Sequence, residues 1–111
     1  TIEEGVDEPV GGVARFKTAL EQYRDLEPLT IFSGDAFSPS TLTNVTKGMH
    51  MIKPLNEFKI DVACMGNHEF DLYIDVLKDN ISKCNFPWLL SNVVDPDTKE
   101  SFGGGKFYHT I

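Results

Sequence analysis

The chain has 111 residues, which is enough for one small domain and too few for two. It carries 10 basic and 17 acidic residues, a formal net charge of −7. No basic run occurs, so nucleic acid and an anionic membrane surface are poor candidates for its main partner. A phosphorylated substrate remains compatible with this charge, because a bound divalent cation would supply positive charge locally. The composition leaves the cellular compartment open.

The first part of the chain is predicted to contain a loop, a helix and a strand. Residues 1–12 are acidic and rich in glycine, which is typical of a loop. Apolar residues then recur at helical spacing and predict a helix over residues 13–26. A short apolar run at residues 29–33 predicts the first strand.

A second helix is expected over residues 40–57. Ser38-Pro39-Ser40 places a capping residue and a proline at its start, which is a common helix-start signal. Pro54 lies inside the same apolar pattern and cannot donate a backbone hydrogen bond. The sequence therefore predicts a kink or a break at Pro54.

The remaining elements continue the alternation of strand and helix: a strand over 60–65, a helix from near 71 to 84, a strand over 86–94 and the beginning of a fourth strand over 106–111. Alternation with nearly continuous apolar strands is typical of a parallel sheet that is covered on both faces and built with right-handed crossovers. The sequence therefore predicts an α/β fold.

The two cysteines are predicted to be buried free thiols. Cys64 lies near the end of the strand at 60–65, and Cys84 lies at the end of the helix that follows. A helix of about twelve residues is roughly 18 Å long. The two thiols should therefore lie at opposite ends of this strand–helix unit, too far apart for a disulfide.

Polar side chains follow two of the predicted strands. Gly34-Asp35 follows the first strand, and Gly66-Asn67-His68-Glu69-Phe70-Asp71 follows the second, where Gly66 is expected to permit a tight bend. One crossover separates these strands, so their ends should be neighbours or near-neighbours, where open α/β sheets bind ligands. An aspartate carboxylate can bridge two cations, and an asparagine carbonyl oxygen can bind one. The pattern predicts a metal site formed by Asp35 and Asn67.

His68 is placed to protonate a departing alkoxide or to stabilise charge on phosphoryl oxygens. Asp71, three residues later, could accept a hydrogen bond from the other ring nitrogen and keep the imidazole charged. Plainer interpretations stay open, since Asp35 could be a turn residue and Asp71 could cap the following helix. Glu69 is expected to be a structural group rather than a metal ligand.

Together, the two motifs resemble signature motifs of the calcineurin-like metallophosphoesterases, and the run Gly66–Asp71 resembles the 5'-nucleotidase branch in particular. Four flanking stretches are similar to that branch as well: Gly11–Arg15, Lys47-Gly48, Leu55-Asn56 and Leu90–Val93. The resemblance implies a layered α/β sandwich of the metallophosphoesterase type, present here as a partial, mostly parallel sheet flanked by helices.

The resemblance also implies roles for the site residues. Asp35 would bridge two divalent metal ions (zinc, manganese, iron or magnesium), Asn67 would bind one of them, His68 would be the catalytic histidine and Asp71 its partner. The implied reaction is 5'-nucleotidase-like hydrolysis of a phosphomonoester by a hydroxide that the two metals activate. The implied substrate is a small phosphorylated molecule such as a nucleotide, as in nucleotide catabolism. The alternative function is a phosphoesterase-like scaffold without metals that serves binding.

The family's opening Asp-x-His motif would precede Thr1, and its later histidine motifs would follow Ile111. We therefore expect residues 1–111 to be part of a metallophosphoesterase catalytic domain. Because two ligands cannot fill the shell of a metal ion, the chain alone is expected to bind metal weakly and to hydrolyse phosphoesters poorly. Another chain or the rest of the parent protein is expected to complete the sheet, since open strand edges favour pairing.

Overall fold

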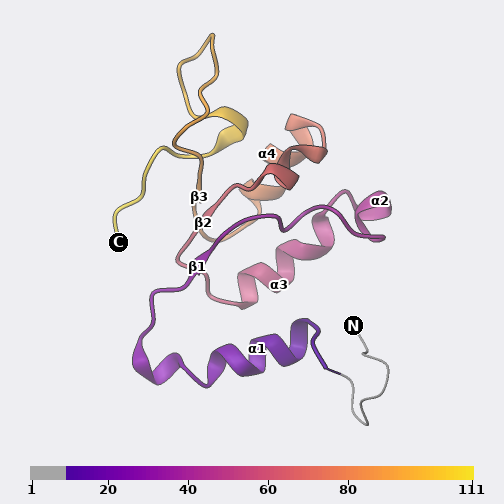
Figure 1. Ribbon diagram of the computed structural model, residues 1–111, viewed down its shortest axis with the longest axis vertical. Coiled ribbons are helices and arrows are strands. Elements are labelled where there is room, and N and C mark those ends of the chain that lie inside the picture. Colours follow the sequence, from indigo (N-terminus) through magenta and orange to yellow (C-terminus); the bar gives the residue numbers. More distant parts are fainter. Residues whose placement is uncertain (1–9) are drawn as a thin grey trace.

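The computed structural model describes residues 10–111, so most of the loop expected at 1–12 lies outside the described residues. Three short parallel strands form the centre of the structure, in the spatial order β1 (Ile31–Phe32), β2 (Val62–Cys64) and β3 (Trp88–Leu89). Figure 1 shows them side by side, with α3 and α4 on one side of them. The predicted α/β fold with a partial parallel sheet is confirmed.

Among residues 10–111, four α-helices and four short 3-10 turns connect the strands. In chain order they are α1 (Val13–Glu21), η1 (Arg24–Leu26), α2 (Thr43–Thr46), η2 (Met49–Met51), α3 (Ile52–Glu57), η3 (Asn67–Asp71), α4 (Ile74–Ser82) and η4 (Phe102–Gly104). None of the described helices is long and apolar enough to span a bilayer.

The hydrophobic core lies on one face of the sheet. Ala63 and Trp88 are paired across neighbouring strands and both point into this core. Leu55 of α3 and Leu77 of α4 are fully buried against the same cluster. Helix α1 contributes less: it has no buried residue, and it lies beside α3 at the edge of the molecule (Figure 1).

The opposite face of the sheet is only partly covered by the described residues. Successive strand residues point to opposite faces, so Ile31 and Cys64 face away from the core. Ile31 is 65% exposed, and the Cys64 thiol is exposed as well. The predictions that both faces are covered and that Cys64 is buried are therefore wrong for this part of the chain. Both cysteines are free, and Cys84 is half-buried.

The break in the predicted second helix lies at Lys47-Gly48 rather than at Pro54. Both residues have positive φ angles, 53° and 83°, which end α2. A side chain at Gly48 would place its Cβ 2.8 Å from Cβ of Phe37, so the chain passes too close to the core for any other residue. Pro54 lies in the first turn of α3, where backbone N–H groups have no helical partner, and it causes no break.

Several other elements are shorter than the sequence pattern predicts. The helix expected at 13–26 is divided into α1 and η1, and α4 begins at Ile74 rather than near 71. The fourth strand is reduced to one parallel bridge between Lys106 and Leu89. In this bridge the N–H of Lys106 donates to the carbonyl of Trp88 at 2.8 Å.

Truncation of Leu77 should destabilise the fold, because it opens a cavity where α4 packs against the core. We expect Leu77→Ala to lower the free energy of unfolding by about 2–5 kcal/mol, measured by urea denaturation. Val45→Ala removes an apolar side chain that is 83% exposed, so it should change the free energy of unfolding by no more than about 0.5 kcal/mol. Equal effects of the two substitutions would contradict the packing of α4 described above.

Candidate active site

A buried carboxylate holds the ends of β1 and β2 together. Glu69 is fully buried, and its Oε2 accepts hydrogen bonds from the backbone N–H groups of Gly66 at 2.7 Å and Asp35 at 2.8 Å. Its Oε1 accepts from the N–H groups of Ala36 at 2.6 Å and Phe37 at 3.4 Å. A carboxylate tolerates burial when such donors replace its water shell. This arrangement, called here the Glu69 bridge, agrees with a structural role for Glu69.

Two glycines make the close approach of these strand ends possible. Gly34 has φ of 92°, and a Cβ there would lie 2.4 Å from the backbone nitrogen of Gly66. Gly66 has φ of −88° and ψ of −177°, which any residue can adopt, so glycine is not needed for a bend. It is needed for space, since a Cβ at Gly66 would lie 2.1 Å from Oδ1 of Asp35.

The predicted metal ligands Asp35 and Asn67 lie just beyond these strand ends. Asp35 has φ of 59°, an uncommon angle for a residue other than glycine, and its Oδ1 accepts a hydrogen bond from the N–H of His68 at 3.0 Å. Both side chains are exposed. Within the described residues, Oδ2 of Asp35 and the side-chain amide of Asn67 have no hydrogen-bond partner, so both are available to a ligand.

The donor atoms of this site fit a divalent metal ion in part. Carboxylate and amide oxygens suit magnesium, manganese, iron or zinc. Among residues 10–111, however, no group of three or more His, Cys, Asp or Glu side chains is arranged to hold an ion. Asp35 and Asn67 can therefore supply only part of a metal shell.

His68 and Asp71 lie in contact at the same edge of the sheet. Nδ1 of His68 is 2.7 Å from Oδ2 of Asp71, and about two fifths of each side chain is exposed. The hydrogen bond with Asp71 raises the pKa of His68 above its usual value, although partial desolvation opposes the shift. The pKa of Asp71 is lowered by hydrogen bonds from His68 and from Ser38. The side chain of Asp71 does not cap α4, whose N-terminal cap position is Tyr73.

Sequence reasoning missed one contact of this pair. The sequence pattern assigns Ser38 only to a helix start, but its Oγ donates a hydrogen bond to Oδ2 of Asp71 at 2.8 Å. The only available signal was its position in the loop that also carries Asp35.

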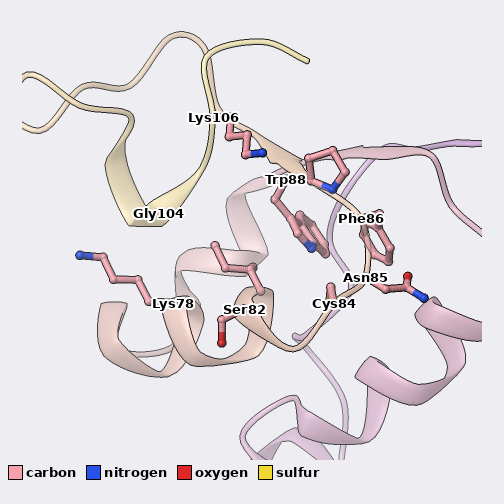
Figure 2. A pocket seen from close by; sticks show the side chains of 10 residues that line it. Lys78, Ser82, Cys84, Asn85, Phe86, Trp88, Gly104 and Lys106 are labelled. Carbon is pink, nitrogen blue, oxygen red and sulfur yellow. The ribbon is translucent and has the colours of Figure 1, made fainter. Parts of the chain in front are cut away.

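A separate open cleft, of about 730 Å³, lies beside β3. Figure 2 shows the indole of Trp88 at its centre, with Lys106 to one side and Cys84 to the other. Cys84 and its neighbours precede β3, whereas Asp35 and Asn67 follow β1 and β2. None of the residues that line this cleft belongs to the candidate site, and two of them, Gly104 and Lys106, come from the segment after β3.

Neutralising the buried carboxylate should destabilise the protein. In Glu69→Gln, one side-chain oxygen becomes an NH₂ group that faces N–H donors, so we expect a loss of about 2 kcal/mol or more in the free energy of unfolding. Chemical denaturation measures this loss. Glu100→Gln, an identical change at an exposed side chain, is the control and should cost no more than about 0.5 kcal/mol. Equal stability of the two variants would contradict the Glu69 bridge.

The pairing of His68 with Asp71 should be visible in its titration. In metal-free protein, the NMR titration midpoint of His68 should lie above the usual histidine value of about 6.5 and should fall in Asp71→Asn. A raised pKa means that the contribution of His68 to stability is complete below about pH 6.5 and is lost as the pH rises through the folded-state value. Asp75→Asn removes an equal charge from an exposed position on α4 and should leave the midpoint unchanged. A His68 midpoint that does not respond to Asp71→Asn would refute the pairing.

Comparison of the sequence with known proteins finds relatives named 5'-nucleotidase. The proteins from Bos taurus and Homo sapiens are 38% and 34% identical to this chain over 87 residues, which is 76% of the chain and 15% of each relative. The snake venom 5'-nucleotidase of Crotalus adamanteus is 35% identical over 86 residues, 75% of the chain and 15% of that protein. No family model matches the sequence.

The fold is similar to two solved structures. The NAD nucleotidase of Haemophilus influenzae has a TM-score of 0.75 at 23% identity, covering 87% of this chain and 20% of its own. A candidate 5'-nucleotidase from Staphylococcus aureus has a TM-score of 0.69 at 24% identity, covering 89% of this chain and 21% of its own. The sequence relatives show that the chain matches one segment, about 15% of the length, of proteins of the 5'-nucleotidase family, and the two solved structures show that it shares their fold.

Proposed function

We propose that the protein carrying this chain is a metal-dependent phosphoesterase that hydrolyses phosphomonoesters in the manner of a 5'-nucleotidase. The supporting observation is the convergence of four side chains at one edge of the sheet. Asp35 and Asn67 offer unpartnered oxygen atoms, and His68 lies beside them in contact with Asp71. The Glu69 bridge fixes the two backbone segments that carry this group.

In this proposal Asp35 and Asn67 hold two divalent metal ions together with ligands from outside residues 10–111. Such ions, when bound, neutralise charge on a phosphoryl group and lower the pKa of a water molecule bound to them toward neutrality. The bond from the N–H of His68 to Oδ1 of Asp35 orients that carboxylate and leaves Oδ2 free. Asp35 and Asn67 would thus contribute oxygen donors from two loops that are fixed relative to each other.

His68 would donate a proton to the leaving oxygen or stabilise charge on the phosphoryl group. Its Nδ1 is hydrogen-bonded to Asp71, so Nε2 would be the atom that faces a substrate. A raised pKa keeps a larger fraction of the ring protonated near neutral pH, which suits a proton donor. Asp71 would hold the ring in this orientation and compensate its charge.

A nucleotide is the proposed substrate class, because the relatives are named 5'-nucleotidase and one structural neighbour is an NAD nucleotidase. Other small phosphorylated metabolites, including sugar phosphates, fit these residues equally well. Among the described residues, β1 has a strand neighbour on one side only, and Ile31 is exposed; both observations support a further element, from the parent protein or another chain, that completes the sheet.

The alternative function is a phosphoesterase-like scaffold that binds a partner and performs no hydrolysis. The observation that favours it is the lack of a three-residue metal cluster among residues 10–111. The two functions differ in whether the protein, supplied with metal, turns over a phosphomonoester.

The test is hydrolysis of p-nitrophenyl phosphate and AMP by the full-length protein that carries this chain, with added manganese or zinc. We expect metal-dependent turnover and a loss of about 10²–10⁴-fold in kcat for His68→Ala, since general acid catalysis contributes that much. His109→Ala, at an exposed histidine far along the chain from the motifs, is the control and should retain activity.

The 111-residue chain alone should turn over poorly in the same assay, because it supplies only part of the metal shell. Turnover by this chain that matches the full-length protein would contradict that part of the proposal. No turnover by the full-length protein with any divalent metal would favour the binding scaffold.

A further inference from the structure

We propose that Ser38 is a positioning residue that orients Asp71 and, through it, the ring of His68. Oγ of Ser38 donates a hydrogen bond to Oδ2 of Asp71 at 2.8 Å, and the same oxygen lies 2.7 Å from Nδ1 of His68. An ionised carboxylate only accepts hydrogen bonds, so both partners are donors. Ser38, Asp71 and His68 therefore form a chain of three side chains that joins the loop after β1 to η3. This inference rests on the proposed function of His68.

The backbone next to Ser38 is fixed to the core. Phe37, the preceding residue, is 1% exposed, and its N–H lies within reach of Oε1 of Glu69. The carbonyl of Phe37 accepts a hydrogen bond from Oγ1 of Thr43 at 2.6 Å. Ser38 thus starts from an anchored position, which limits where its hydroxyl group can point.

Asp71 needs such an anchor. Its side chain is 41% exposed, and among the described residues only His68 and Ser38 form hydrogen bonds with its carboxylate. Without Ser38, rotation about the side-chain bonds and competition from water would let Oδ2 leave Nδ1 of His68. The hydroxyl group of Ser38 restricts this rotation and keeps one oxygen of Asp71 directed at the imidazole.

The kinetic test compares Ser38→Ala and Ser38→Thr in the full-length protein. Ser38→Ala should lower kcat by about tenfold with KM changed less than twofold, because the substituted group acts on His68 rather than on the substrate. Ser38→Thr keeps the hydroxyl group and should restore most of kcat. Ser40→Ala is the control for general loosening of the loop, since Oγ of Ser40 accepts a hydrogen bond from the N–H of Thr43 and, among the described residues, forms none with Asp71.

Two kinetic results would overturn the proposal. The first is a kcat of Ser38→Ala within twofold of the unsubstituted protein. The second is a loss in Ser40→Ala as large as that in Ser38→Ala, which would assign the effect to the loop as a whole.

A second measurement decides the role of Ser38 even if the protein has no phosphoesterase activity. Solvent exchange of the Nδ1 proton of His68, followed by ¹H–¹⁵N NMR in metal-free protein, reports its hydrogen bond to Asp71. Exchange should be about tenfold faster or more in Ser38→Ala and close to the original rate in Ser38→Thr and Ser40→Ala. Unchanged exchange in Ser38→Ala would refute the positioning role, whereas missing turnover with altered exchange would refute the proposed function alone.

Discussion

One buried carboxylate determines the geometry of this edge of the sheet. The side chain of Glu69 joins four backbone N–H groups from two loops. The loops must approach closely enough for one carboxylate to reach both, and this approach requires glycine at positions 34 and 66. The positive φ of Asp35 belongs to the same arrangement, since its N–H must point at Glu69. Sparsely populated backbone angles persist where the surrounding contacts fix them.

The structure separates residues that hold the site from residues that a ligand can reach. Glu69 and Phe37 are buried and fix the backbone, whereas Asp35, Asn67 and Asp71 are exposed. A site for a small molecule needs accessible side chains, but exposed side chains are mobile unless their backbone and hydrogen-bond partners are fixed. Here the buried Glu69, directly after His68, fixes the backbone. Hydrogen bonds among Ser38, Asp71 and His68 then limit the positions of these side chains.

The sequence predicts the convergence of the two motifs well, because glycine and polar residues follow consecutive strands of a parallel sheet. It predicts less about how the convergence is achieved. The prediction that Gly66 permits a bend is wrong, because its backbone angles are open to any residue. Glycine is needed there because a Cβ would collide with Asp35, which lies far away in the sequence. The break at Lys47-Gly48 depends on Phe37 in the same way. The exposure of Cys64 depends on which face of the sheet lacks a helix, and a hydrophobic strand pattern carries no information on that.

The Glu69 bridge connects positions that are 34 residues apart in the chain, between Asp35 and Glu69. Everything between them, from α2 through α3 to β2, has to fold back before the bridge can close. Contacts of such long sequence separation form only after the entropy of loop closure has been overcome. We therefore expect the site to form only together with the β1–β2 pairing and to be lost when that pairing opens. The geometry of the candidate site would then depend on the integrity of the whole crossover and not only on the few residues at its ends.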